Sequence, residues 1–327
     1  LAKSYVLPSV FGAKEPKENC ADLRTKGWEL SLNWNDSFAL MGKRFNYTVS
    51  ASLGDNKTVI TKYNNPEKLL TDYYEGMVLG EIWGYRIDGL FASDEEATEY
   101  TSKINQDFVN ARILSDKVEP YYRAGDLKFR DLDNNNVINK GDDTVYDPGD
   151  REIIGNETPR YNYSFRLGAD WNGFDLGVFF QGVGKRDWYP SHLSTGFWGP
   201  YARAFTSFIP ENFMDQCWSE ENPGGYLPRF RGYQTFADSQ LGVNNDRYLQ
   251  DASYIRLKNL TVGYTLPVLK KVFTKLRVYF TGENLWYWSP MKKYTKYIDP
   301  EAAGGNGNTG MAYNYSRNFS VGVDITF

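Results

Sequence analysis

The segment from Asp131 to Asp142 carries oxygen-bearing residues at a spacing that suits a divalent cation. Carboxylate or amide side chains stand at its first, third, fifth and ninth positions, an acid stands at the twelfth, and a backbone carbonyl is available at the seventh. Ca²⁺ takes about six to eight oxygen ligands, and a loop with this spacing can supply them. The predicted ligands are Asp131, Asp133, Asn135, the Val137 carbonyl and Asp142, with Asn139 acting through a water molecule.

This segment is similar to the calcium loops of EF-hand and dockerin modules, with one departure. Asn136 stands where such loops usually carry glycine, and asparagine tolerates a left-handed backbone better than most residues. The flanking helices of a complete EF-hand are not evident in the sequence. We therefore predict one Ca²⁺ as a cofactor, and the alternative is a loop rich in Asx turns that binds nothing.

A second group of candidate residues consists of aromatic side chains between residues 186 and 250. Exposed rings beside polar groups offer surfaces on which a sugar or a peptide can stack. Ligand contact is predicted for Trp188, Tyr189, Trp198 and Tyr201. The alternative is that these rings pack against one another inside a folded loop.

The sequence offers little for catalysis. His192 is the only histidine, which removes most histidine-based metal and triad chemistry. Glu220 and Glu221 are adjacent rather than placed across a cleft, so they predict no acid and base pair for glycoside hydrolysis. Cys20 and Cys217 could form a disulfide or remain two unrelated thiols. We expect a protein that is not an enzyme.

Nucleic acid is excluded as an expected partner by the charge pattern. The net charge is −4, and acidic and basic residues are mixed along the 327 residues without a basic stripe. Aromatic residues make up 17% of the chain, so the supply of large apolar rings is rich. No run of about 18 apolar residues is present, which excludes a transmembrane helix but leaves a membrane barrel possible, because its strands alternate in hydropathy.

The elements that must position the candidate residues are expected to be β-strands. Apolar and polar residues alternate over segments about ten residues long, the length of a tilted strand that crosses a bilayer. Asn172-Gly173 is a strong signal for a two-residue hairpin turn. The strands are predicted at about 27–35, 44–62, 161–171, 174–185, 253–266, 275–288 and 315–327, with a further strand near residues 1–7.

Short and long connections alternate between these strands. The short ones fall at about 36–42, 172–173 and 267–274, and the long ones at about 64–159, 186–250 and 289–314. In an antiparallel meander every long loop then lies at one end, which is the asymmetry of outer-membrane barrels. We expect the long loops, with the acidic loop and both cysteines, to be extracellular.

A soluble β-sandwich would show the same alternation with its apolar face turned inward, so the period alone does not decide the fold. Aromatic residues at strand ends, such as Trp28 and Trp34, favour a membrane barrel with interfacial girdles. The last strand ends on Phe327, which resembles the terminal aromatic signal for barrel assembly. The fold class is therefore predicted as all-β, an antiparallel transmembrane β-barrel. The alternation breaks in one place, because the outward phase that contains Leu260 would also turn the charged Lys258 outward. A bulge, or an exit of the strand above the membrane, would account for this.

Several blocks of the sequence resemble, in the same order, blocks of the SusC/RagA group of TonB-dependent transporters. They run over nearly the whole chain. The blocks are Lys26–Leu30 (KGWEL), Gly80–Phe91 (GEIWGYRIDGLF), Gly125–Asp131 (GDLKFRD), Ile154–Asn156 with Pro159, Phe174–Gly182 (FDLGVFFQG), Tyr248–Asn259 (YLQDASYIRLKN), Gly282–Leu285 (GENL) and the final Phe327.

The resemblance implies a barrel of about 22 strands, of which residues 1–327 would supply about the last eight. It also implies a plug and earlier strands from the same or another chain, a TonB contact through the missing N-terminal part, a SusD-like surface lipoprotein and outer-membrane lipid. The cargo would be oligosaccharides, glycans or peptides. A passive porin and a secreted, β-rich, calcium-dependent glycan-binding or adhesion module are the alternatives.

Overall fold

A computed structural model describes residues 2–4, 17–109, 122–207, 209, 211–236, 239–267, 274–303 and 314–327. Its main element is one sheet of seven strands in the order β17-β16-β15-β10-β9-β4-β3, in which every neighbouring pair is antiparallel. The strands are β3 (Ala21–Leu40), β4 (Lys43–Tyr63), β9 (Arg160–Trp171), β10 (Phe174–Lys185), β15 (Tyr254–Leu266), β16 (Lys275–Trp288) and β17 (Asn318–Thr326). The predicted meander is confirmed.

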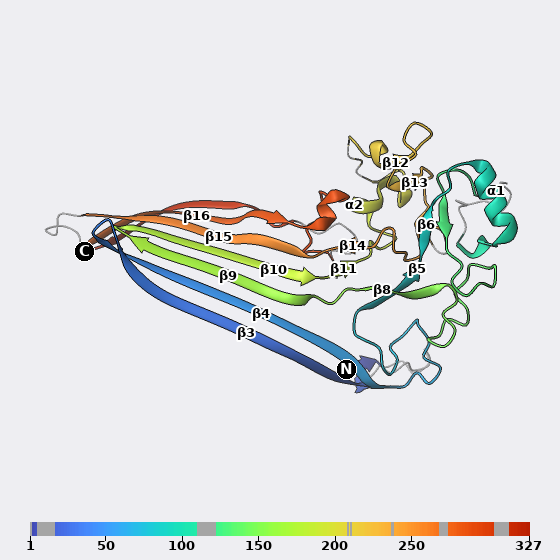
Figure 1. The fold of residues 1–327 in the computed structure, drawn as a ribbon, viewed down its shortest axis with the longest axis horizontal. Coiled ribbons are helices and arrows are strands. Elements are labelled where there is room, and N and C mark those ends of the chain that lie inside the picture. The colour runs from blue at the N-terminus through green and yellow to red at the C-terminus, as the bar shows by residue number, and fades with distance from the viewer. Residues whose placement is uncertain are drawn as a thin grey trace, which may run out of the picture.

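The strands are joined at one end by tight turns (Figure 1). Asn172 and Gly173 both have positive φ angles, of 49° and 87°, as a two-residue turn with matching twist requires. Met41 and Gly42 form the equivalent turn between β3 and β4, with φ angles of 50° and 74°. The predicted connection at 36–42 was therefore too long. Most of the turn expected at 267–274 lies outside the described residues.

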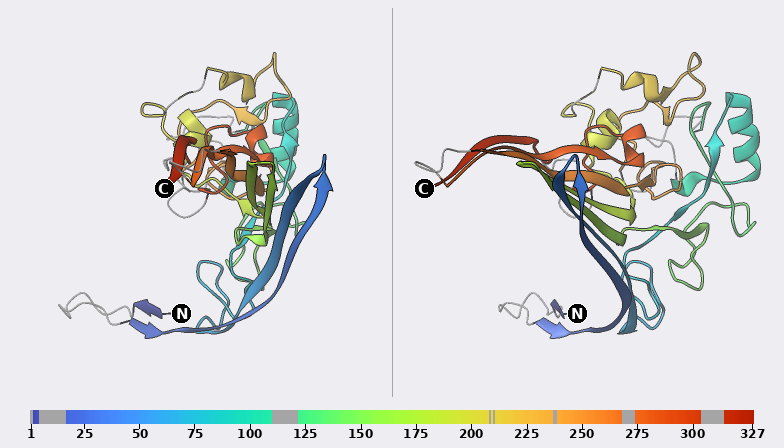
Figure 2. Two further views of the ribbon diagram at one scale, coloured as in Figure 1. Left: turned by 90° about the vertical axis from the view of Figure 1, so that its left-hand side faces the viewer. Right: turned by 60° about the vertical axis from the view of Figure 1, so that its left-hand side comes forward.

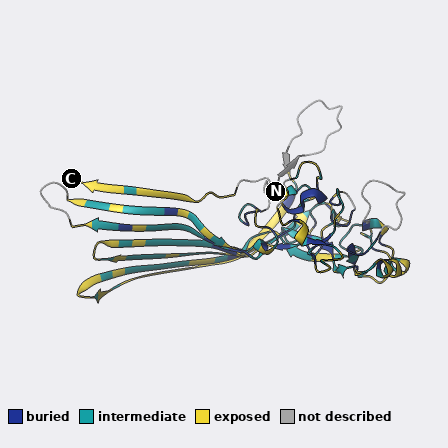
Figure 3. Cartoon of the chain, turned by 90° about the horizontal axis from the view of Figure 1, so that it is seen from above, coloured by how far each residue is buried: buried dark blue, intermediate teal, exposed yellow. Residues whose placement is uncertain are grey.

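The apolar phase of the strands is exposed, as the barrel prediction requires. Leu30 is 50% exposed and Val323 is 54% exposed, and Val49 is half-buried. The hydrophobic cores of the described residues contain no side chain from the seven strands. The sheet is also curved (Figure 2). Its strands are mostly exposed or half-buried, whereas the buried residues gather at the end of the molecule away from the tight turns (Figure 3). A sandwich core is thus ruled out for this sheet.

A bulge resolves the phase break that the sequence showed in β15. Phe179 of β10 pairs with Asn259, whereas the next residue, Phe180, pairs with Leu257, so Lys258 is the extra residue. Between the bulge and the tight turn, the residues of β15 that face outward are Leu260 and those that alternate with it. On the other side of the bulge Leu257 pairs with the exposed Trp286 of β16, and alternation continues on the outer face. The bulge also turns Arg256 to the opposite face.

The long connections fold together at the other end of the sheet into one body, which we call the loop body (Figure 1). Its hydrophobic core draws on all three long loops, for example Phe129, Trp198 and Met291. Short strand pairs frame it: β5 (Glu81–Tyr85) with β8 (Arg151–Asn156), β6 (Ile87–Leu90) with β7 (Leu127–Phe129), β11 (Asp187–Trp188) with β14 (Gln250–Asp251), and β12 (Cys217–Trp218) with β13 (Leu227–Arg229).

The loop body also contains the helices of the described residues. They are α1 (Asp94–Lys103), α2 (Thr195–Trp198) and the short 3₁₀ segments Asp107–Val109, Gly199–Tyr201, Met214–Gln216 and Pro290–Lys293. Ser93 caps α1, because its hydroxyl accepts a hydrogen bond from the Glu96 amide and three acidic residues fill the first turn. In the described part of the chain, no helix is long and apolar enough to cross a membrane.

The edges of the seven-stranded sheet are β3 and β17, and within the described ranges they do not pair with each other. An eighth strand was expected near residues 1–7, of which 1 and 5–7 lie outside the described residues. β1 (Ala2–Ser4) pairs instead with β2 (Lys17–Asn19) in a separate two-stranded sheet just before β3.

Candidate functional site

The acidic loop brings three carboxylates together. One oxygen each from Asp131, Asp133 and Asp150 lies within 4.8 Å of the others. The backbone reaches this arrangement by turning through positive φ at Asn134 (61°) and Asn136 (65°). Asn136 therefore does take the left-handed conformation that a calcium loop usually gives to glycine.

Hydrogen bonds from the backbone hold each carboxylate in place. Asp150 is fully buried, and its two oxygens accept from the amides of Leu132 and Asn139 at 2.8 Å each. Asp131 Oδ2 accepts from the Asn136 amide at 2.8 Å, whereas its buried Oδ1 has no hydrogen-bond partner. An orphaned buried carboxylate oxygen beside two further carboxylates is chemically suited to a hard cation.

The membership of this cluster differs from the predicted ligand set. Asp131 and Asp133 are in it, but Asp142 is not, and Asp150 takes part although it lies beyond the twelve-residue loop. Asn135 Oδ1 accepts from the Val137 amide at 2.7 Å, and Asn139 Oδ1 accepts from the Gly141 amide at 2.6 Å. In this structure the two asparagine oxygens serve Asx turns.

Burial and mutual repulsion make it unfavourable for all three carboxylates of the cluster to be ionised. Burial raises the pKa of the Asp150 carboxyl above its usual range, and the nearby charges of Asp133 and Asp131 raise it further, although the two backbone hydrogen bonds oppose the shift. A bound cation would remove this penalty, because it converts mutual repulsion into shared attraction.

Three of the four aromatic candidates are buried, and the fourth, Tyr189, is half-buried. Trp188, Trp198 and Tyr201 belong to the core of the loop body, and Tyr189 packs against it. Their polar atoms are also engaged: Tyr201 donates to the Pro228 carbonyl at 2.6 Å and Trp198 to the Ser191 carbonyl at 3.1 Å. The structure therefore gives these rings the packing role that the sequence left open, and not an open face for a ligand.

The single histidine and the two cysteines form no reactive centre. His192 is exposed in the loop body, where its ring lies 6.1 Å from that of Phe236. Cys20 and Cys217 form no disulfide with each other. Burial raises the pKa of the Cys217 thiol, which disfavours the reactive thiolate.

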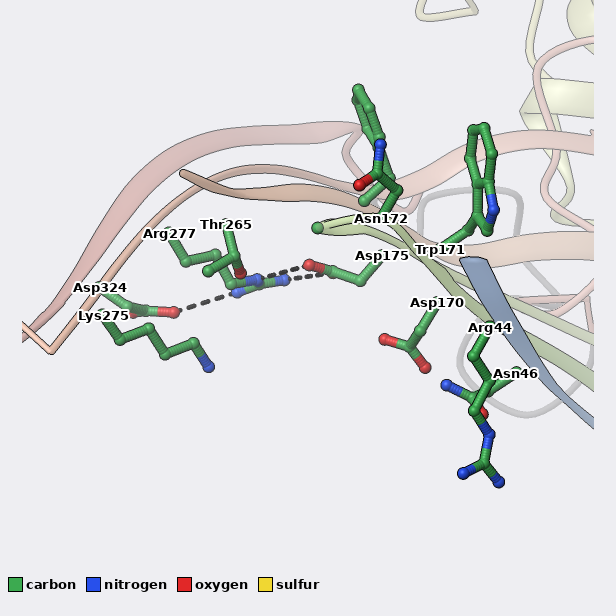
Figure 4. Close-up of a pocket in the computed structure, with 12 residues that line it drawn as sticks. Arg44, Asn46, Asp170, Trp171, Asn172, Asp175, Thr265, Lys275, Arg277 and Asp324 are labelled. Atoms are coloured by element: carbon green, nitrogen blue, oxygen red, sulfur yellow. Dashed lines mark hydrogen bonds and ion pairs between the residues drawn. The ribbon is translucent and has the colours of Figure 1, made fainter. Parts of the chain in front are cut away.

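Among the described residues, the polar face of the sheet carries a larger and a smaller hollow that no sequence motif indicated. The larger one, of about 480 Å³, lies beside the tight turns (Figure 4). There Arg277 of β16 donates to both oxygens of Asp175 on β10, at 2.8 and 2.6 Å, and to Asp324 on β17 at 3.0 Å. The pair between Arg277 and Asp175 joins strands that are not immediate neighbours in the sheet, since β15 lies between β10 and β16.

The smaller hollow, of about 300 Å³, lies farther from the turns, across β3, β4, β9 and β10. Directly opposite residues form two rows on this face, and both rows were readable in the sequence as the polar phase of alternating strands. The first row is Asn33, Ser50, Arg166 and Phe179; the second is Ser31, Ser52 and Ser164.

Comparison with known proteins gives relatives over the whole chain. No family model matches the sequence. TonB-dependent receptor P26 of Formosa agariphila is 26% identical over 100% of this chain, and TonB-dependent receptor P3 of the same organism is 27% identical over 98%. TonB-dependent receptor SusC of Bacteroides thetaiotaomicron is 22% identical over 95%. All three are named as receptors and none as an enzyme.

A solved structure of the RagAB peptide transporter shares the fold, with a TM-score of 0.62 at 20% identity over 98% of this chain. The chain spans only 31% of that structure's matching chain and 27–31% of the length of the three curated relatives. The seven-stranded sheet is thus similar to part of a transporter barrel. From its motifs to its fold, the chain is similar to the SusC/RagA-like TonB-dependent receptors, and the predicted resemblance is confirmed.

Proposed function

We propose that this chain is part of the wall of an outer-membrane, TonB-dependent importer of large nutrients, either oligosaccharides and other glycans or peptides. The observation that carries the proposal is the curved sheet with one apolar and one polar face, in a chain similar throughout to TonB-dependent receptors. Lipid would cover the apolar face and the polar face would line the import path. The importer would act by binding and conformational change, without covalent chemistry.

The exposed apolar face supports a membrane location over the secreted module. Leu32, Trp34 and Val321 are among many large apolar side chains exposed on it. A contiguous apolar surface of this extent is rare on proteins that are stable in water. Trp286 and Trp288, near the end of β16 that faces the loop body, and Trp28 on β3 supply the amphipathic rings that a membrane interface favours.

The partners of the importer follow from the same proposal. The remaining strands and a plug would come from sequence that the longer relatives possess beyond the matched region, and TonB would act on that part. The loop body would be extracellular and would meet a SusD-like lipoprotein, which the two-part name of the RagAB peptide transporter supports. Phe327, which is exposed at the end of the last strand, would serve as the assembly signal.

Calcium would order the acidic loop and take no part in cargo binding. The observation that favours a cation is the unpartnered Asp131 Oδ1 beside Asp133 and Asp150. Asp150 accepts from the amides of Leu132 and Asn139, which lie seven residues apart in the loop, so a cation held there would fix the loop's shape. Millimolar calcium outside the cell suits a site of modest affinity.

Uptake by cells that carry the full-length gene tests the transport proposal. The gene would be deleted and restored, and import of fluorescently labelled oligosaccharides and peptides of similar mass would be measured with and without TonB. Restored uptake of one class that requires TonB is the expected result. Uptake that persists without TonB would indicate a passive porin, and recovery of the protein from the medium rather than from the outer membrane would indicate a secreted module.

A further inference from the structure

The seven strands carry six arginines, which differ in the carboxylates that they contact. Arg277 contacts Asp175 and Asp324, Arg160 contacts Asp55, and the buried Arg256 contacts Asp299 and Glu301. Arg166, in the middle of β9, contacts no carboxylate among the residues that the structure describes. Arg24 and Arg44 form no ion pair among these residues either, but Arg44 lines the larger hollow together with three aspartates, whereas Arg166 lines a hollow that contains no acid.

The surroundings of Arg166 hold it in place on the polar face. Its cross-strand neighbours are Ser50 on β4 and Phe179 on β10. The guanidinium carbon lies 5.2 Å from the centre of the Phe179 ring, which is within the range of a cation–π contact. The guanidinium forms no hydrogen bond with the described residues, so its donors remain available to an acceptor.

The rest of the hollow offers hydrogen-bond donors. Ser52 and Ser164 lie hydroxyl to hydroxyl at 2.7 Å, so whichever accepts retains its own hydrogen for another acceptor. Asn33 adds amide donors, and Ser50 adds a hydroxyl. No acidic side chain lines this hollow, whereas Asp170, Asp175 and Asp324 line the larger one. The hollow is therefore complementary to an acceptor that carries negative charge.

We propose that Arg166, with Ser50, Ser52 and Ser164, forms a carboxylate-binding site on the polar face of the sheet. A carboxylate fits because its two oxygens match the guanidinium fork and its single charge balances one arginine. A phosphate monoester carries nearly two negative charges at neutral pH and would require a further cation that the hollow lacks. The carboxylate comes either from cargo, such as a peptide C-terminus or a uronic acid, or from an acidic side chain elsewhere in the full-length polypeptide.

This inference rests on the proposed function in one respect, that the polar face lines the import path. Its test does not require transport. Purified full-length protein would be treated with p-hydroxyphenylglyoxal, and modification of individual arginines would be followed by mass spectrometry. Acetate would be compared with chloride at equal ionic strength. Arg203, exposed in the loop body, and Arg277, which is already paired, serve as internal references.

For an open site, modification of Arg166 should slow in acetate by the factor 1 + [acetate]/Kd, which is about threefold at twice the Kd. Arg203 and Arg277 should change much less. If another part of the polypeptide supplies the carboxylate, acetate has no effect on Arg166. A carbodiimide should then join the lysine of the Arg166→Lys variant to an Asp or Glu outside residues 1–327.

Acetate protection and carbodiimide cross-linking together test the proposed site. Acetate protection assigns the site to an external carboxylate, and a cross-link to the remainder of the polypeptide assigns it to an internal one. If acetate gives no protection and no cross-link forms, the site does not exist. A cross-link to an acid within residues 1–327 would also overturn the proposal, because Arg166 would then be neutralised by its own wall.

Discussion

Replacing Asp150 by asparagine tests the revised ligand set of the acidic loop. The carboxylate of Asp150 is fully buried and belongs to the three-carboxylate cluster, whereas that of Asp142 does not. Asp150→Asn keeps the size of the side chain and can retain one acceptor for a backbone amide, but it removes the charge that would face a cation. Asp142→Asn is the matched control, since it removes the same charge from the same loop.

The size of the calcium effect can be worked out from mass action. Extracellular calcium modules have Kd values of about 0.1 to 1 mM. At about 10 mM Ca²⁺ the bound loop is then stabilised by RT ln(1 + [Ca²⁺]/Kd), or about 1.4 to 2.7 kcal/mol. Amides whose hydrogen bonds close with the loop, those of Leu132, Asn136 and Asn139, should exchange about 10 to 100 times more slowly.

Hydrogen exchange of the peptide that covers residues 131–150, measured in the full-length protein with calcium or with EDTA, provides the assay. The unsubstituted protein and Asp142→Asn should respond to calcium, and Asp150→Asn should not. Magnesium at the same concentration should have little effect, because it demands a smaller and more regular oxygen cage. Equal exchange in calcium and EDTA would refute the cation. Loss of the response in Asp142→Asn alone would refute the cluster and restore the original ligand set.

The pH dependence has a defined sign. The pKa of Asp150 is raised in the folded loop, so the folded state binds a proton more tightly than the unfolded chain does. Without calcium the loop should therefore become more stable as the pH falls through this raised pKa. With calcium the trend should reverse, because protonation of Asp150 competes with the ion. Exchange measured in EDTA that quickens on acidification, after correction for intrinsic rates, would contradict this reasoning.

Further variants test the sheet and the loop body. Val321→Arg, on the apolar face, should lower the stability of the membrane-folded protein by about 2–4 kcal/mol, whereas Ser320→Arg on the polar face should not. Heat-dependent gel mobility measures both variants. Equal effects would contradict the assignment of the two faces. Arg256→Met leaves Asp299 buried without its charge partner and should cost about 3–5 kcal/mol in a denaturation experiment, and Arg256→Met with Asp299→Leu should recover most of it. Trp198→Ala should cost the loop body about 3–5 kcal/mol and expose it to proteolysis while the sheet persists; reduced cargo binding with unchanged proteolysis would instead favour ligand contact.

The strands could be predicted because alternation is a local property. Trp28, Leu30, Leu32 and Trp34 repeat with period two, and one residue of slippage would turn all of them to the polar side. The bulge could be predicted from the phase break at Lys258 for the same reason. The compensating irregularity in β16, where Asn284 takes a φ of 52°, gave no sign in the sequence.

The errors arose where a local signal competes with contacts that are distant in sequence. Asp36 and Ser37 favour turns, yet they continue β3 in register with β4, and the turn falls at Met41-Gly42, which lacks a strong turn sequence. Asp150 lies outside any twelve-residue calcium pattern, because only folding brings it to Asp131. The composition of the segment from 186 to 250 could not show whether its rings would be buried or exposed.

The shared core of the three long loops has a consequence for the order of folding. Its side chains range from Tyr85 to Ala303, so most of its contacts join residues that are far apart in sequence. Such contacts form slowly, because a long chain closure must precede any gain from burial. Met291, Ile298 and Ala303 belong to this core and lie in the connection between β16 and β17. The loop body therefore cannot finish folding until that connection is in place. Under the proposed extracellular placement of the loop body, incomplete export of the chain would leave the rings of the earlier loops without their partners. Completion of the sheet and of the loop body should therefore be a single late event.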